Sequence, residues 1–295
     1  MNGTNDPVIR EVATPRRADD VLAKAVFAVV IAYAVFLACA YAYGAWLVSN
    51  RGQIIPVDFI SVWAAGHLAI TGEPAAAYDW PVHKAVEEAG IGHPYDKYFG
   101  WHYPPPFLFI AAPLARLPYL SAFLVWMLLS MAAYAATIRA IVGRRIALAL
   151  ACAFPGVLWN VVDGQNGFMT AAFLGGALAA MERQPVLAGT LLGLLGYKPQ
   201  FGLLFPLVLA VSGRWRAFLS AALTTVAMIG ATWWVFGLQT WRAFFEWLPI
   251  ASRLILGSGL AGFGKLQTVF GMVRSLNGSE DLAWLCLLYT SDAAD

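Results

Sequence analysis

Acidic residues are missing from two long stretches of the sequence. Neither Asp nor Glu occurs between Lys97 and Val162, or between Arg183 and Phe245. Of the 295 residues, 60% are hydrophobic and 12% are charged, whereas soluble domains carry roughly 25% charged residues. With so few charges, the sequence predicts an all-α polytopic membrane protein rather than a soluble domain with an anchor.

Apolar runs of helical length indicate where the chain crosses the bilayer. The first run, Ala23–Val48, is too long for the apolar core of a signal peptide, which has about 7–15 residues, so we expect a retained span. Several of the later runs are short or interrupted by Gly or Pro, which is typical of helices packed inside a bundle. These further spans are expected at about 119–141, 146–159, 167–182, 185–197, 200–212 and 217–237.

Two longer, more polar segments separate the spans. Ser49–Pro105 follows the first span, and Gln239–Asp281, with the amphipathic stretch WRAFFEWLPIASRLIL, precedes a last span that starts near Leu282. The apolar piece 107–117 is too short to cross a bilayer at about 1.5 Å per residue. We therefore expect a transmembrane helix bundle with interfacial or re-entrant helices in long loops.

Basic residues predict the orientation, because cytoplasmic loops carry an excess of Lys and Arg. With residues 1–22 as a cytoplasmic tail, the long polar segments lie on the outer side. The first of them, Ser49–Pro105, contains six acids and three bases. The inner connections then contain the arginines Arg139, Arg144, Arg145, Arg183, Arg214 and Arg216.

The sequence divides into a tail at 1–22, a transmembrane domain at 23–286 and a short tail at 287–295. The end, LLYTSDAAD, turns polar after only about seven apolar residues of the last span. We therefore expect residues 287–295 to be non-native and the membrane domain to be incomplete.

Several classes of site are not indicated. No basic tract of the kind that binds nucleic acid is present. Cys39, Cys152 and Cys286 lie in apolar segments without a C-x-x-C pair, so neither a disulfide framework nor a zinc site is predicted. The four histidines show no H-E-x-x-H spacing, and no metal site is predicted.

Asp58 is a candidate functional residue on the predicted outer side. It lies about ten residues after the first span, and an apolar helix-like segment with Phe59 and Trp63 follows it. In one interpretation Asp58 is simply the N-cap of that helix. In the other, a carboxylate against an apolar wall acts as a general base.

The stretch Asp163-Gly-Gln-Asn-Gly167 is a polar turn between two spans on the same side. Its glycines allow a tight reversal, and Gln165 and Asn166 offer hydrogen-bond donors and acceptors. These groups either complete a turn between helices or bind the hydroxyls of a polar ligand.

Lys198 lies in the stretch Tyr197-Lys-Pro-Gln200, at the outer ends of two short spans. It either extends to the membrane interface or provides a fixed cation for a phosphate, with Gln200 as a second polar group. His102 and Tyr103, in the stretch WHYPPP, either belong to the interfacial aromatic belt or contact a phosphate or sugar.

The order of five stretches resembles glycosyltransferase family 87, which belongs to the GT-C superfamily and includes polyprenol-phosphate-mannose-dependent α-1,2-mannosyltransferases. The resemblance spans about 55–215, and the family normally continues with further spans and another outer loop. The stretches are Asp58-Phe59, GEPAAAYD at 72–79, Tyr103-Pro104-Pro105, Gly164-Gln165-Asn166 and Lys198-Pro199.

The resemblance implies an inverting enzyme of the bacterial inner (plasma) membrane with its active site on the outer face. Such an enzyme moves a hexose, mannose in the first instance, from a polyprenyl-phosphate donor to a lipid or glycan acceptor, without cofactor or metal. Asp58 is then the general base. Lys198, His102 and Tyr103 are assigned to the donor phosphate. The residues assigned to the sugar or acceptor are Gln165, Asn166, Asp163 and Gln200.

A polytopic transporter or flippase of lipid-linked sugars is the alternative, because helices broken by Pro and Gly are typical of transporters. That alternative predicts an internal repeat and ionisable groups near the middle of spans. The sequence shows no repeat, and its polar groups gather at the outer ends of the spans. A non-enzymatic membrane scaffold would leave this one-sided gathering unexplained.

Overall fold

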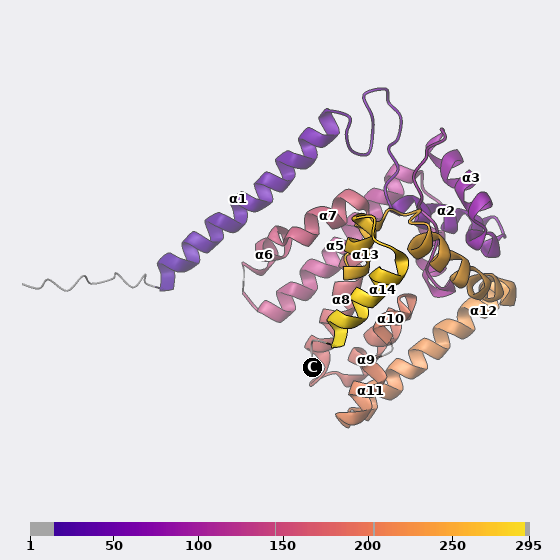
Figure 1. Ribbon diagram of the computed structural model, residues 1–295. Coiled ribbons are helices and arrows are strands. Elements are labelled where there is room, and N and C mark those ends of the chain that lie inside the picture. The colour runs from indigo at the N-terminus through magenta and orange to yellow at the C-terminus, as the bar shows by residue number, and fades with distance from the viewer. Residues whose placement is uncertain (1–14, 145, 203, 293–295) are drawn as a thin grey trace, which may run out of the picture.

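The computed structural model describes residues 15–144, 146–202 and 204–292, which form a bundle of helices (Figure 1). The α-helices are α1 (Pro15–Ala42), α2 (Phe59–Ile70), α3 (Trp80–Ile91), α4 (Leu108–Leu114), α5 (Tyr119–Val142), α6 (Ala147–Ala153), α7 (Pro155–Asp163), α8 (Gly167–Ala180), α9 (Pro185–Leu194), α10 (Pro199–Gly202), α11 (Leu204–Val211), α12 (Trp215–Ser252), α13 (Val269–Ser275) and α14 (Glu280–Asp292). Shorter helical turns are η1 (Pro74–Tyr78), η2 (Pro105–Phe107), η3 (Leu195–Tyr197), η4 (Arg253–Gly257) and η5 (Phe263–Lys265).

The predicted all-α membrane fold is confirmed. Within the described residues, three helices are long and apolar enough to cross a membrane, at Asp20–Ala42, Tyr119–Val142 and Trp215–Gly257. The shorter apolar helices pack between them, since α5 contacts α8, α8 contacts α9, and α9 contacts α12. Of the two predicted tails, residues 1–14 and 293–295 lie outside the described residues, and residues 287–292 belong to α14.

Three predicted spans differ from the observed helices, and each difference has a backbone cause. The first helix ends at Ala42 rather than Val48, where the chain enters a loop with isolated bridges between Trp46, Val48 and Ile54. The span predicted at 146–159 is two helices, because Pro155 lacks an N–H and holds the residue before it extended.

The last of the three is α12, which continues to Ser252 instead of ending near residue 237. Gly237, with φ 78° and ψ 163°, breaks the helical path, so the second half of α12 turns back toward α2 and α3 (Figure 1). A residue with a side chain rarely adopts this backbone conformation. The amphipathic stretch WRAFFEWLPIASRLIL, which we predicted in a separate segment, therefore lies in the second half of α12, with its last four residues in η4.

α2 is enclosed at one end of the bundle, where α3, α4 and η1 pack around it. Nine of its 12 residues are buried, so it is not a surface helix. Phe59, at its start, contacts the rings of Tyr119, Phe123 and Trp126 from α5. This aromatic contact fixes the first turn of α2, and with it the position of Asp58.

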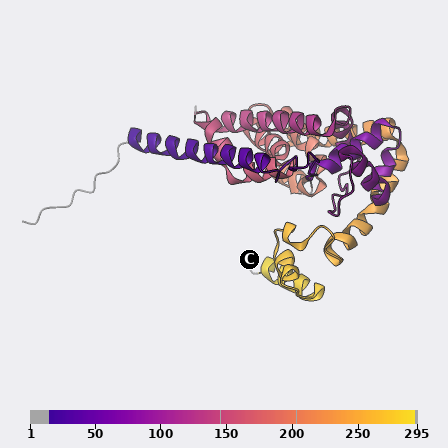
Figure 2. The same ribbon diagram turned by 90° about the horizontal axis from the view of Figure 1, so that it is seen from above.

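The C-terminal part of the described chain lies beside the bundle rather than within it (Figure 2). α13 packs against α14 and against η5, which precedes it in the chain. The connection from α12 through η4 and η5 returns along the bundle, and this return brings Lys265 close to the start of α2.

Candidate functional site

A polar cavity of about 500 Å³ lies where the start of α2, the loop before η2, the α7–α8 turn, the η3–α10 connection and the segment after α12 meet. Among the eight side chains that the sequence singled out, seven line it. They are Asp58, His102, Tyr103, Gln165, Asn166, Lys198 and Gln200. Asp163 lies at the end of α7 and is not part of the lining. The structure thus brings together residues up to 142 positions apart in the sequence, counted from Asp58 to Gln200.

The carboxylate of Asp58 points away from the helix that it precedes. Asp58 occupies the N-cap position of α2, but its side chain makes no capping hydrogen bond. Instead, Oδ2 accepts a hydrogen bond from Nε2 of Gln165, and Oδ1 lies 3.0 Å from Nζ of Lys265. The N-cap interpretation therefore describes the backbone position but not the role of the carboxylate.

Asn160 holds the turn that presents Gln165. Its Oδ1 accepts from the backbone N–H of Gly167 at 2.8 Å, and its Nδ2 donates to the carbonyl of Gln165 at 2.9 Å. The indole N–H of Trp126 donates to the carbonyl of Gly164 at 3.3 Å. Asn160 could not be predicted from the sequence, because a hydrogen bond across seven residues leaves no sequence pattern.

We expect Gly164→Ala to destabilise this turn. Gly164 has φ +68°, and a Cβ there would lie 2.7 Å from Cβ of Phe59 and 2.9 Å from Cε2 of Phe123. Positive φ and crowding together should lower the free energy of unfolding by about 2–4 kcal/mol. Thermal unfolding in detergent measures this loss.

Gly143→Ala is the matched control for that substitution. Gly143 also ends a helix with φ +67°, but a Cβ there would meet nothing within 4 Å. It should therefore lose only the backbone part, about 1 kcal/mol. Equal losses for the two variants would show that crowding of the new Cβ against Phe59 and Phe123 adds nothing to the backbone cost.

The side-chain amide of Asn166 is buried in the cavity wall without a protein partner. Asn166 is 3% exposed, and among the described residues neither of its amide atoms makes a hydrogen bond. Burial raises the pKa of Tyr103 to about 12. The nearby Asn166 amide opposes this rise, and the charge of Asp58 adds a smaller contribution to it. Tyr103 therefore keeps its hydroxyl proton, and Asn166 offers an unused donor and acceptor to a ligand.

Both ring nitrogens of His102 have a polar neighbour. The indole N–H of Trp247 donates to the carbonyl of Trp101 at 2.9 Å and also lies 3.3 Å from Nδ1 of His102. Nε2 in turn lies 3.3 Å from the hydroxyl of Tyr98. Burial, followed by the charge of His83, lowers the pKa of His102 to about 4. At neutral pH, His102 can contact a phosphate only as a hydrogen-bond donor and not as a cation.

Because His102 is buried, the free energy of unfolding should depend on pH, and His102→Gln should remove this contribution. The unfolded chain takes up a proton on this side chain near pH 6.5, whereas the folded protein resists it down to a pKa of about 4. The free energy of unfolding should therefore fall by about 2 kcal/mol between pH 7 and pH 5 from this group alone. In unfolding measured at the two pH values, His67→Gln should keep this fall. An unchanged fall in His102→Gln would contradict the assignment.

Lys198 lies in the connection between η3 and α10, with its side chain on the cavity wall. Burial lowers the pKa of its ammonium from the ordinary value. Its Nζ lies 6.0 Å from the centre of the Phe201 ring, and within the described residues no carboxylate pairs with it. A partly desolvated ammonium without a carboxylate partner favours the binding of an anion.

The positions of two charged residues, Lys265 and Asp163, differ from what the sequence predicted. Lys265 lines the cavity and contacts Asp58, although 207 positions separate the two residues. Burial and then the Asp58 charge raise the pKa of Asp163, against the attraction of Lys265 and Lys97. Asp163 is therefore an electrostatic neighbour of the site and not a side chain of its wall.

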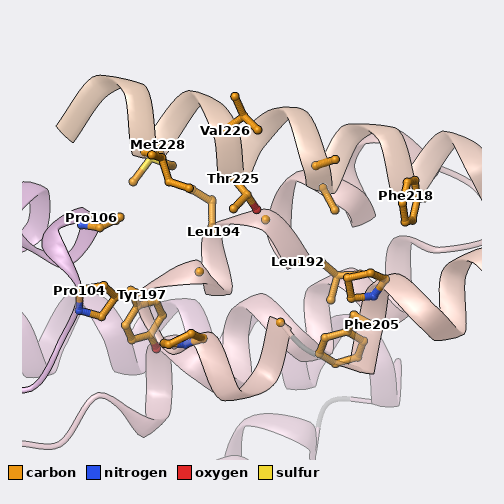
Figure 3. Close-up of a pocket in the computed structure, with 18 of the residues that line it drawn as sticks. Pro104, Pro106, Leu192, Leu194, Tyr197, Phe205, Phe218, Thr225, Val226 and Met228 are labelled. Atoms are coloured by element: carbon orange, nitrogen blue, oxygen red, sulfur yellow. The ribbon is translucent and has the colours of Figure 1, made fainter. Parts of the chain in front are cut away.

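A second, apolar pocket of about 510 Å³ adjoins the polar cavity (Figure 3). Thr225 and Met228 of α12 lie on the side of that helix that faces Leu192 and Leu194, as Figure 3 shows. Three residues belong to the walls of both spaces, namely Tyr197, Pro199 and Phe244. A ligand with a charged head and an apolar chain could therefore occupy both at once.

Metal ligands do not gather here, since the described residues contain no group of three or more His, Cys, Asp or Glu placed to hold an ion.

In comparisons with known proteins, the model of glycosyltransferase family 87 matches residues 101–294. No curated protein and no solved structure matches the chain. The matched part contains every lining residue from His102 to Lys265, while Asp58 precedes it.

Proposed function

The chain belongs to glycosyltransferase family 87 and is a membrane glycosyltransferase, and we propose that it uses a polyprenyl-phosphate sugar as its donor. The proposed donor sugar is a hexose, mannose in the first instance, and the acceptor is a lipid or glycan on the outer face of a bacterial inner membrane. The observation that carries this proposal is the pairing of a polar cavity with an apolar pocket along a shared wall.

The apolar pocket fits the first isoprene units of a lipid-linked donor. Its lining consists almost entirely of apolar side chains from α9, η3, α11 and α12. A nucleotide sugar would leave this pocket unused, because its base and ribose need polar partners. With the chain in the pocket, the phosphate at its end would reach the shared wall at Tyr197 and Pro199, next to Lys198.

Asp58 would act as the general base. Its carboxylate takes the proton from an acceptor hydroxyl, and that oxygen attacks the anomeric carbon of the sugar. The bond between the anomeric carbon and the phosphate oxygen breaks, and the polyprenyl phosphate leaves with the bonding electrons. A single displacement of this kind inverts the anomeric centre. Gln165 would hold the carboxylate in place through its hydrogen bond to Oδ2.

Lys198 would stabilise the leaving group. The donor phosphodiester carries one negative charge, and the departing polyprenyl phosphate gains a second. A fixed ammonium next to the developing charge stabilises the transition state more than the bound donor. The hydroxyl of Tyr103 and a ring N–H of His102 would donate hydrogen bonds to the same phosphate or to the sugar.

The buried amide of Asn166 would bind sugar hydroxyls. An unpartnered amide in a cavity wall discriminates strongly, because a ligand that lacks the matching hydroxyl leaves it unsatisfied. Gln200, which is exposed at the rim of the same cavity, would contact the acceptor.

Transfer of labelled mannose by membrane vesicles that contain the protein tests this proposal. We expect label to pass to membrane acceptors from polyprenyl-phosphate mannose and not from a nucleotide-linked mannose. Donors with longer isoprenoid chains should have the lower KM, because they fill the apolar pocket. Transfer from the nucleotide sugar alone would contradict the proposal, as would uptake of solute or translocation of lipid-linked sugar without any transfer.

A further inference from the structure

Lys265 is the one cation that forms an ion pair with Asp58 among the described residues. Its Nζ lies 3.0 Å from Oδ1 of Asp58 and 5.2 Å from the centre of the Phe99 ring. The side chain of Lys265 is 53% exposed and that of Asp58 is 27% exposed. Because neither partner is fully desolvated, the pair contributes little free energy, and it can separate readily.

In the empty cavity, each carboxylate oxygen of Asp58 already has a partner. Oδ1 pairs with the ammonium of Lys265, and Oδ2 accepts the amide of Gln165. An acceptor hydroxyl would have to share Oδ1 with Lys265, whose ammonium takes one of the two lone pairs of that oxygen. The amide of Gln165 can stay during the reaction, since it only orients the carboxylate.

Lys265 has a second possible partner within the same cavity. It lines the cavity together with Lys198, and an ammonium forms charge-assisted hydrogen bonds with a phosphate as well as with a carboxylate. Lys265 belongs to η5, a short turn between α12 and α13, rather than to a helix of the bundle. Its side chain can therefore change partner without a change in the helices that hold Asp58 and Lys198.

We propose that Lys265 pairs with Asp58 while the cavity is empty and moves to the donor phosphate when the donor binds. The move would free Oδ1 of Asp58 to take the proton of the acceptor hydroxyl only when a donor is present. Lys265 would thus couple donor binding to the release of the base, and on the phosphate it would act as a second cation beside Lys198. This inference rests on the proposed function, because it needs a phosphate in the cavity.

A double-mutant cycle on ligand binding tests this exchange without relying on transfer. The probe is a short-chain polyprenyl monophosphate, and its binding to purified protein in detergent is measured by isothermal titration calorimetry. Lys265→Met should bind the probe at least about 10-fold more weakly, since it loses a charge-assisted contact. Lys265→Arg should restore most of the affinity, and Lys97→Met, an exposed lysine outside the cavity lining, should bind as the wild type does.

Asp58→Asn carries the distinctive prediction. In this variant Lys265 no longer has to leave a carboxylate, so the probe should bind several-fold more tightly than to the wild type, even though transfer is lost. In the Lys265→Met background this gain should shrink, because only the repulsion between Asp58 and the phosphate then remains to be removed. A purely structural pair between Asp58 and Lys265 would make both single variants bind more weakly.

Two results would overturn the exchange while leaving the proposed function in place. One is wild-type affinity in Lys265→Met, and the other is an equal gain from Asp58→Asn in both backgrounds. If the wild type neither binds the probe nor transfers sugar from a lipid-linked donor, the proposed function fails, and the exchange fails with it.

Discussion

Asp58→Asn is expected to lower the rate of sugar transfer by about 10²- to 10⁴-fold, the range that a positioned general base contributes. Asparagine has nearly the same shape as aspartate but cannot take a proton from the acceptor hydroxyl. Its side chain can still bond to Gln165, so the turn between α7 and α8 should persist. Initial rates of label transfer from polyprenyl-phosphate mannose measure the loss, and thermal unfolding in detergent confirms that the variant is folded.

Two further variants show whether the effect belongs to Asp58. Asp163→Asn changes a carboxylate near the site that does not line the cavity, and its loss should stay below about 10-fold because no direct contact to the reacting atoms is removed. Asp96→Asn changes an exposed carboxylate in the loop after α3, outside the cavity lining, and should transfer at the wild-type rate. A larger loss in Asp163→Asn than in Asp58→Asn would transfer the role of base to Asp163.

Lys198→Met should have the second largest effect, a fall in kcat/KM of about 10²- to 10³-fold, as is typical when one group that stabilises developing charge is removed. The leaving phosphate gains charge during the reaction, so most of the loss should appear in kcat rather than in KM. Methionine retains most of the apolar stem of lysine, so packing around Phe201 should change little.

The controls for Lys198 separate charge from shape. Lys198→Arg should recover part of the rate, since it keeps a cation at the wall, although the guanidinium has a different geometry. Lys97→Met should have no effect on transfer. If the transfer rate of Lys198→Met stays within about threefold of the wild-type rate, Lys198 does not stabilise the leaving phosphate.

The helices could be predicted from the sequence where hydrophobic periodicity and length agree. The span expected at 119–141 is α5, Tyr119–Val142, and that expected at 167–182 is α8, Gly167–Ala180. The prediction failed where the backbone decides instead of hydropathy. Pro155 divides one expected span into α6 and α7, and Gly237 turns α12 without ending it.

The candidate site was predictable to the extent that its residues lie in local polar motifs. Gln165 and Asn166 stand out as amides between two apolar runs, and both line the cavity. Asp163 stands out equally, but it does not line the cavity. Gly164, in the left-handed conformation, turns the chain between Asp163 and Gln165, so that only Gln165 lines the cavity. Direction around a turn depends on backbone dihedrals that the residue types alone do not specify.

Lys265 and Asn160 show the other limit of sequence reasoning. Lys265 comes to Asp58 only because Gly237 turns α12 back and the connection to α13 returns along the bundle. Asn160 supports the site through two hydrogen bonds to the turn that follows α7. Both contacts arise from tertiary structure, which hydropathy and motif spacing do not encode.

In the proposed mechanism, the cavity around Asp58 holds the phosphate and sugar of a lipid-linked donor. The most direct measurement is an experimental structure of Asp58→Asn with a polyprenyl-phosphate sugar bound. We expect the phosphate within about 4 Å of Nζ of Lys198, the usual limit of an ion pair, with the isoprene units in the apolar pocket and the anomeric carbon facing residue 58. A donor bound with its phosphate away from Lys198, or with its sugar outside the cavity around residue 58, would contradict it.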